Sequence, residues 1–152
     1  VYDAILELGK TTDTLDIDGK IISEKNIPIL NSEKIQLALK SFKGKSTQIP
    51  PMFSAKKVNG RRLYQLARKG ISVKRNPNEI YIKRIEFLDY TKPCISFRVE
   101  CSKGTYIRVL GKELAEKLST VGFLKSLNRI QVGNYKLSNS LSIERFEKEW
   151  KC

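Results

Sequence analysis

The alternation of apolar and polar residues predicts several β-strands along the chain. It is regular over Tyr2–Leu8 and Ile95–Cys101, which is the pattern of a strand with one buried face. Further strands are predicted over Ile71–Val73, over Glu79–Asp89 and within Gly122–Tyr135. Together these segments favour a sheet in which most strands are antiparallel.

Two further features of the strand pattern are a short segment after a turn and a change of phase. Lys20–Ser23 follows a polar turn and is predicted to be a short returning strand. In the segment Glu79–Asp89 the alternation changes phase between Ile82 and Ile85. Such a change predicts either a β-bulge or a strand that is buried on both faces.

Apolar residues at three- and four-residue intervals predict helices between the strands. The helices expected are one capped within Asn31–Glu33 that ends at Phe42, one over Arg61–Lys69, one from Ile107 to Leu118, and one capped by Ser142 that ends at Trp150. Helices and strands are therefore interspersed, as in an α+β fold. A length of 152 residues suits one domain with its own core, so residues 1–152 are expected to be a single domain.

The junction between the second regular strand and the helix after it holds the residues with chemical potential. Gly104 permits a sharp turn, and Ser102 or Thr105 is expected to cap the helix. Tyr106 and Arg108 follow at the helix start, where backbone amides and a guanidinium together favour an anion or a carboxylate. An ordinary strand-to-helix turn with a surface arginine would produce the same spacing.

The charge of the chain is strongly positive and unevenly distributed. There are 29 Lys and Arg against 16 Asp and Glu, a formal net charge of +13. The interval from Lys34 to Asn78 holds twelve of the basic residues and no acid. Such a surplus favours a polyanion, nucleic acid before membrane. The alternative is a basic surface that is merely solvated. The interval that holds basic residues and no acid argues against this alternative.

Within that interval, residues 48–75 have the character of a projecting arm. Pro50-Pro51 imposes extended backbone, and Asn59-Gly60 suits the tight turn of a hairpin. A short basic helix follows and ends at Gly70. We expect this segment to carry positive charge toward a phosphate backbone, and the alternative is a surface excursion without a partner.

Cysteine and histidine usage excludes several chemistries. The three cysteines have no metal-ligand spacing, and the sequence contains no histidine. A zinc site, a disulfide framework and a Ser-His or Cys-His mechanism are therefore not expected. The acidic turn around Asp16 does not supply the ligands of a calcium loop. Cys101 lies on the apolar phase of its strand and is predicted to be a core residue.

Three motifs in this sequence resemble the TruB family of tRNA pseudouridine synthases, which act on uridine 55 of the T-loop. They occur in the family's order and cover nearly the whole chain. The residues that carry the resemblance are Tyr2, Leu8-Gly9, Thr12-Asp13-Thr14, Asp16 and Gly19, then Gln48–Ala55, Lys57–Gly60, Leu63-Tyr64, Ala67-Arg68 and Gly70, then Cys101–Arg108.

The resemblance implies a pseudouridine synthase fold, with a largely antiparallel sheet flanked by helices and a basic thumb-like insertion at residues 48–75. It also implies roles in catalysis. Tyr2 would stack on a flipped uridine, and Arg108 would pair with the catalytic carboxylate. Tyr106 would support that arginine or the substrate, and Leu127 would form a wall of the base pocket.

The resemblance further implies that the insertion closes over the T-loop of tRNA, with no cofactor or metal involved. The expected RNA-binding residues are Lys56, Lys57, Arg61, Arg62, Arg68, Lys69, Arg75, Lys103 and Arg129. A cytoplasmic monomer without a membrane segment is expected.

The sequence departs from the family pattern in one functional respect. The family's aspartate precedes the tyrosine in a Gly-rich motif, whereas here Val1 alone precedes Tyr2. Asp3, Asp13 and Asp16 belong to a different motif and are not assigned this role. The chain is therefore expected to be the C-terminal portion of a catalytic domain, inactive by itself and without an appended C-terminal RNA-binding domain.

Smaller departures from the family are Asn78 and Asn128 at positions where arginine is usual, which are expected to loosen the grip on RNA. Two alternatives from other classes remain at this point. One is a non-catalytic RNA-binding module on the same scaffold, for which the native chain would start near Val1. The other is a basic ribosome-associated protein, which gives no reason for the Tyr106-Ile107-Arg108 helix start.

Overall fold

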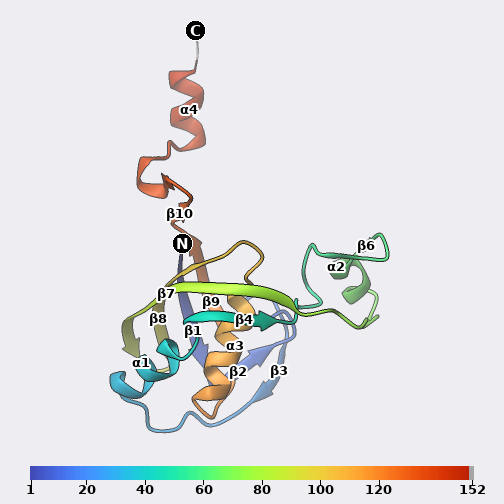
Figure 1. Cartoon of the computed structure of the whole chain (residues 1–152), viewed down its shortest axis with the longest axis vertical. Coiled ribbons are helices and arrows are strands. Elements are labelled where there is room, and N and C mark those ends of the chain that lie inside the picture. The colour runs from blue at the N-terminus through green and yellow to red at the C-terminus, as the bar shows by residue number, and fades with distance from the viewer. Residues whose placement is uncertain (151–152) are drawn as a thin grey trace.

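A five-stranded antiparallel sheet forms the centre of the computed structural model, which describes residues 1–150 (Figure 1). The strand order is β4-β7-β8-β1-β9, so the first strand lies between two strands from the later part of the chain. The strands are β1 Tyr2–Leu8, β4 Gly44–Gln48, β7 Asn78–Thr91, β8 Cys94–Cys101 and β9 Gly122–Arg129. The α+β class predicted from the sequence is confirmed.

Most of the predicted strands are present, and one is not. The change of phase in β7 corresponds to a shift of register against β8 between Ile82 and Arg84, as a bulge requires. Residues 71–73 form no strand, because the segment from 71 to 77 has no ladder partner on its way from the arm to the sheet. Asn78 begins β7 and pairs with Gln48.

Four α-helices accompany the sheet within residues 1–150. They are α1 Ser32–Lys40, α2 Leu63–Ala67, α3 Ile107–Lys117 and α4 Ile143–Glu149. The caps at Asn31 and Ser142 are confirmed, since their side chains accept the N–H groups of Lys34 and Arg145. Because Arg61 and Arg62 pair in a hairpin instead, α2 is shorter than the basic helix predicted from residue 61.

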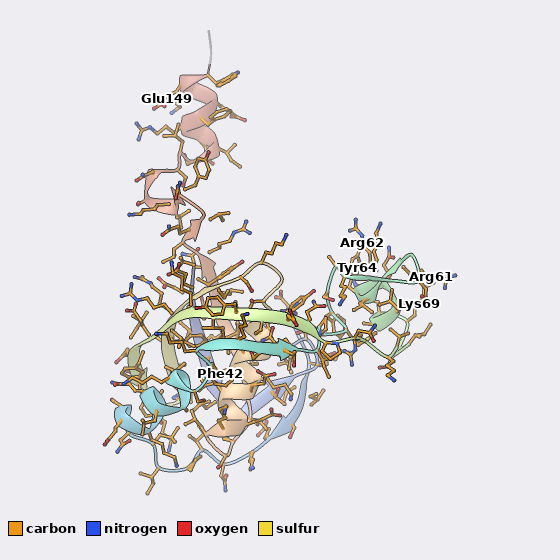
Figure 2. All side chains as sticks on the ribbon, in the orientation of Figure 1. Phe42, Arg61, Arg62, Tyr64, Lys69 and Glu149 are labelled. Carbon is orange, nitrogen blue, oxygen red and sulfur yellow. The ribbon has the colours of Figure 1, made fainter. Side chains whose placement is uncertain are left out.

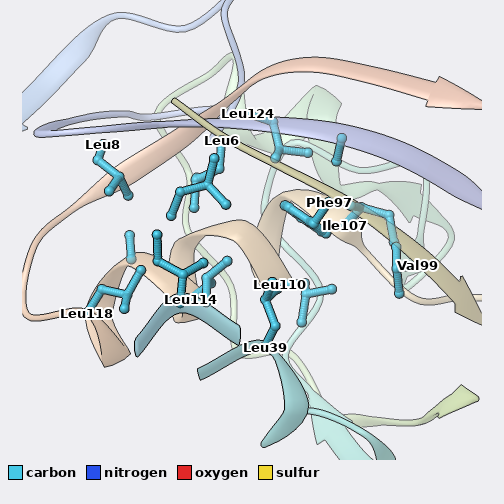
Figure 3. Close-up of a cluster of buried hydrophobic side chains, with 14 of the residues drawn as sticks. Leu6, Leu8, Leu39, Phe97, Val99, Ile107, Leu110, Leu114, Leu118 and Leu124 are labelled. Carbon is cyan, nitrogen blue, oxygen red and sulfur yellow. The ribbon is translucent and has the colours of Figure 1, made fainter. Parts of the chain in front are cut away.

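The core lies between one face of the sheet and helices α1 and α3 (Figure 3). Leu6, Phe97 and Leu124 come from the three strands β1, β8 and β9, and Leu110 and Leu114 come from α3; all five are fully buried. The apolar face of each strand therefore packs against the apolar face of the helix. The two-residue alternation in the strands and the three- and four-residue intervals in the helix predicted these faces. This packing fixes the start of α3 above the end of the sheet formed by Tyr2 and Cys101.

Short hairpins complete the chain. They are β2 Lys10–Thr12 with β3 Ile21–Glu24, β5 Lys57–Val58 with β6 Arg61–Arg62, and β10 Gln131–Val132 with β11 Tyr135–Lys136, followed by the 3₁₀ turn η1 Leu137–Asn139. The lobe that holds β5, β6 and α2 protrudes from one end of the sheet, and the tail with α4 leaves beside the N-terminus (Figure 1).

In residues 1–150, no helix is long and apolar enough to cross a bilayer. The same residues contain no group of three or more His, Cys, Asp or Glu side chains that is arranged to hold a metal ion. Cys94 and Cys101 are free thiols, and burial raises the pKa of Cys101, which packs against the core as predicted. Cys152 lies outside the residues that the structure describes.

Candidate active site

Arg108 is the centre of a polar cluster at the end of the sheet. Its Nη1 donates to the carbonyl oxygen of Thr14 at 2.7 Å and to Oδ2 of Asp16 at 2.8 Å. Its Nη2 donates to the carbonyl oxygen of Phe53 at 2.6 Å. The side chains of Arg108 and Asp16 are 21% and 27% exposed, so the ion pair is shielded but remains open to a ligand.

The loop between β2 and β3 is folded so that it presents Asp16 to this arginine. Oδ1 of Asp16 accepts the Thr14 hydroxyl at 2.6 Å and the Asp18 amide at 3.3 Å. The carbonyl oxygen of Leu15 accepts the amide of Leu124, which ties the loop to β9. With Oδ1 engaged inside the loop, the second carboxylate oxygen is the one that faces Arg108.

The guanidinium of Arg108 keeps donors available. Of its five N–H groups, three are used by the partners named above, and no atom of residues 1–150 accepts from Nε or from the second Nη2–H. A planar guanidinium with an unused edge binds a carboxylate with two parallel hydrogen bonds. The cluster is therefore able to orient a second carboxylate while Asp16 accepts a hydrogen bond from Nη1 of Arg108.

Tyr106 is the N-cap residue of α3, and its own side chain makes no capping hydrogen bond. The cap predicted at Ser102 or Thr105 is wrong, because the Thr105 hydroxyl donates backward to the carbonyl oxygen of Ser102. The buried amide side chain of Gln48 binds the backbone of Tyr106. It accepts the Tyr106 N–H at 2.9 Å and donates to the Tyr106 carbonyl at 3.3 Å.

The other residues expected in the catalytic site lie on neighbouring strands. Tyr2 is opposite Arg129 on β9, and Ala4 is opposite Leu127. Because opposite and alternate residues share a face, these side chains lie on the core face of the sheet. Tyr2 packs against the buried cluster that contains Ile107, and Leu127 is 44% exposed, an apolar surface beside the tyrosine.

On the other face of β1, Asp3 forms a two-point ion pair with Arg98 of β8. The Arg98 Nε and Nη2 atoms lie 2.6 and 2.8 Å from the two carboxylate oxygens. The hydrogen bonds from Arg98 lower the pKa of Asp3 against the opposing effect of burial. This pair fixes the strand that carries Tyr2, and its carboxylate lies on the face opposite to the site.

The predicted RNA-binding residues divide into two groups. The exposed group lies on the arm and on the turn before α3, and Figure 2 shows Arg61, Arg62 and Lys69 extending from the arm. Its members are Lys57, Arg61, Arg62, Arg68, Lys69 and Lys103, together with Arg129 on β9. Lys56 and Arg75 are partly buried at the base of the arm, where they donate to Asn78 at 2.5 Å and to the Pro50 carbonyl at 3.2 Å.

Two residues of the site were missed by the sequence analysis. Asp16 lay in a motif already quoted, but its partner is 92 positions away. Gln48 is 58 positions from Tyr106 and lies at the end of a strand with no helical pattern. Asp16 could have been found as a member of the Thr12–Gly19 motif, whereas no local pattern in the sequence indicates the role of Gln48.

The sheet, the helix start with Arg108 and the protruding basic lobe belong to a chain of the pseudouridylate synthase class. Residues 1–107 match the sequence model of the TruB family pseudouridylate synthase, N-terminal domain. The chain belongs to the TruB family.

Curated relatives carry the name tRNA pseudouridine synthase B. The protein from Clostridium tetani is 43% identical over 148 residues, which are 97% of this chain and 51% of that protein. The protein from Dehalococcoides mccartyi is 44% identical over 146 residues, which are 96% of this chain and 49% of that protein. The chain thus spans about half the length of these relatives.

Two solved structures share the fold. One is a Cbf5-Nop10-Gar1 complex, with a TM-score of 0.62 and 24% identity over 90% of this chain and 31% of that chain. The other is an H/ACA ribonucleoprotein bound to a substrate RNA containing 2'-deoxyuridine, with a TM-score of 0.59 and 20% identity over 97% of this chain and 35% of that chain.

Proposed function

We propose that this chain forms part of an enzyme that isomerises uridine 55 in the T-loop of tRNA to pseudouridine. The observation that carries the proposal is the Arg108 cluster in a chain of the TruB family. A guanidinium held by Asp16 and two carbonyl oxygens keeps an unused edge on which a nucleophilic carboxylate can be oriented.

The positions of the residues support the roles that we propose for them. Tyr2 offers an aromatic face to a base that leaves the stack, and Leu127 offers an apolar wall on the adjacent strand. Arg108 keeps the nucleophilic carboxylate ionised, because a neighbouring positive charge favours the charged form. None of the acids in this chain is assigned as that nucleophile, since Asp16 is bound inside its loop and Asp3 faces the other side.

Binding of tRNA is assigned to the exposed basic residues of the arm. The sequence contains no Asp or Glu from residue 34 to residue 78. The positive charges of the arm are therefore not neutralised by acids in the same segment and can attract phosphates. Phosphate contacts of this kind supply affinity and orientation but no sequence readout. Recognition of the uridine is left to the site at the sheet end.

The test is a tritium-release assay with the natural protein that contains this chain, using T-loop RNA labelled at carbon 5 of uridine. Release that falls by about 10²–10³ in kcat on Arg108→Ala supports the assignment, because a preorganised electrostatic contact is lost. A protein that binds tRNA but releases no tritium, with binding unchanged by Tyr2→Phe and Arg108→Ala, would instead be an RNA-binding module.

A further inference from the structure

Gln48 is the least expected polar residue in the interior of the protein. It is the last residue of β4 and is 1% exposed, although it directly precedes the exposed Ile49. A buried amide requires partners for its oxygen and for its nitrogen. Here both partners belong to the backbone of a single residue, Tyr106.

The two hydrogen bonds form a closed bridge between the arm and the start of α3. Oε1 accepts the Tyr106 N–H at 2.9 Å, and Nε2 donates to the Tyr106 carbonyl at 3.3 Å. The same carbonyl accepts the first helical N–H, that of Leu110, at 3.1 Å. The rotation of the Tyr106 peptide groups is therefore fixed from both sides.

The direction in which Arg108 leaves the helix depends on this fixed start. Arg108 lies two residues beyond Tyr106 and reaches Phe53 with Nη2. Phe53 lies five residues beyond Gln48, so both ends of the segment 48–53 contact the first turn of α3. A displacement of about 1 Å at a catalytic group is enough to reduce a rate by roughly a hundredfold.

We propose that Gln48 is a positioning residue for the reaction, which acts through Tyr106 to hold Arg108 in its productive orientation. The inference rests on the proposed function. It assigns to β4 a role in catalysis that is separate from the RNA-binding role of the arm that begins there. The bridge requires one donor and one acceptor on the same side-chain group, and this requirement makes it testable.

The first variant is Gln48→Glu in the natural protein that contains this chain. Its ionised carboxylate keeps the acceptor for the Tyr106 N–H but faces the Tyr106 carbonyl without a donor. Protonation restores a donor and an acceptor in the shape of the original amide. Since burial raises the pKa of a carboxyl group, the protonated form is reached in mildly acidic buffer.

We expect kcat of Gln48→Glu to fall about tenfold relative to wild type at pH 8, with KM changed less than about threefold, because one hydrogen bond is lost and a buried charge is introduced. The ratio of variant to wild-type kcat should rise toward one as the pH is lowered to 6. The matched control is Gln36→Glu on the exposed side of α1, whose ratio should not depend on pH.

A second measurement does not depend on activity. Exchange of the Tyr106 amide hydrogen in the 152-residue chain should accelerate at least tenfold in Gln48→Leu, which removes the acceptor, and should be unchanged in Gln36→Leu. Should Gln48→Leu not fold, Gln48→Met, which also removes the amide oxygen, gives the same comparison. If the wild-type protein releases no tritium but Tyr106 exchange still accelerates in the Gln48 variant and not in the Gln36 variant, the proposed function is rejected. The hydrogen-bonded bridge between Gln48 and Tyr106 is then still supported.

The positioning role is overturned by either of two results. One is a ratio of kcat values for Gln48→Glu that stays constant between pH 6 and pH 8. The other is an effect confined to KM, which would place Gln48 in RNA binding through the arm. An unchanged rate of Tyr106 exchange in the folded variants also contradicts the bridge.

Discussion

At the scale of single residues, the site depends on how the two oxygens of Asp16 are divided. One oxygen holds the loop through Thr14 and the Asp18 amide, and the other holds Arg108. An asparagine offers one acceptor and one donor, so it satisfies the loop or the arginine but not both. The carboxylate is therefore required for its shape as well as for its charge.

We expect Asp16→Asn to lower kcat for pseudouridine formation about tenfold or more, because a charge-assisted hydrogen bond to Arg108 is lost. Binding of tRNA, measured by filter retention, should change less than about threefold. The control is Asp18→Asn, an exposed acid of the same loop, which should retain wild-type kcat. Equal activities of the two variants would remove Asp16 from the site.

The Asp3–Arg98 pair predicts a dependence of stability on pH. The pKa of Asp3 is lowered in the folded protein, so its contribution is present above the ordinary pKa of an aspartate and is lost as the pH falls through the lowered value. Thermal unfolding of Asp3→Asn at pH 7 should occur roughly 1–3 °C lower than in wild type. Once the pH has fallen below the lowered pKa of Asp3, the two transitions should coincide, and a difference that persists there contradicts the account.

Sequence reasoning identified Arg108 but not the contacts that hold it. The residue follows a glycine turn and begins a strongly periodic helix, and both features are local. Asp16 and Gln48 reach this helix from positions 92 and 58 residues away, where a period of two or 3.6 residues carries no information. Pairings of this kind require the packed structure.

At the scale of elements, the arm has two parts, an exposed basic tip and a base that is fixed by hydrogen bonds. Lys56 and Arg75 fix its root, while the hairpin that contains Arg61 and Arg62 extends outward. The turn of that hairpin is formed by Asn59 and Gly60, both with positive φ, as the Asn-Gly sequence predicted. The charged tip is therefore displayed on a defined scaffold.

Reversal of charge at the tip, Arg61→Glu with Arg62→Glu, should weaken tRNA binding about tenfold or more at 0.1 M salt. The slope of log K against log salt should flatten by about 2, since each lost phosphate contact removes about 0.9. The control reverses Lys34 and Lys43, exposed residues on and just after α1, at the other end of the sheet (Figure 1). Equal slopes for the two variants would exclude the tip from the RNA interface.

Elements with a complete local pattern were predicted well, and those defined by a partner were not. The strands β1 and β8 and the helix α3 have long regular periods, and their apolar faces meet in the core. The segment 71–73 has a strand-like composition but no neighbouring strand with which to pair. The cap predicted for α3 was wrong for a similar reason, because the side chain that binds the backbone at the helix start comes from another element.

At the scale of the whole molecule, two phenylalanines show where the stability resides. Phe97 is fully buried in the centre of the sheet, whereas Phe146 on α4 is 47% exposed and stacks on Trp150. Phe97→Ala in the 152-residue chain should lower the free energy of unfolding by about 3–5 kcal/mol. Phe146→Ala should lower it by less than about 0.5 kcal/mol. Equal losses in urea unfolding would contradict this description of the core.

The strand order has a consequence for how the chain reaches its structure. β1 is made before the other strands of this sheet that the structure describes, yet its two neighbours, β8 and β9, begin at residues 94 and 122. Until those residues leave the ribosome, both edges of β1 lack partners, and its apolar side chains have no sheet to join. Folding dominated by such distant pairings is slow, so β1 spends the period of synthesis as an exposed strand that depends on dilution or a chaperone to avoid other chains.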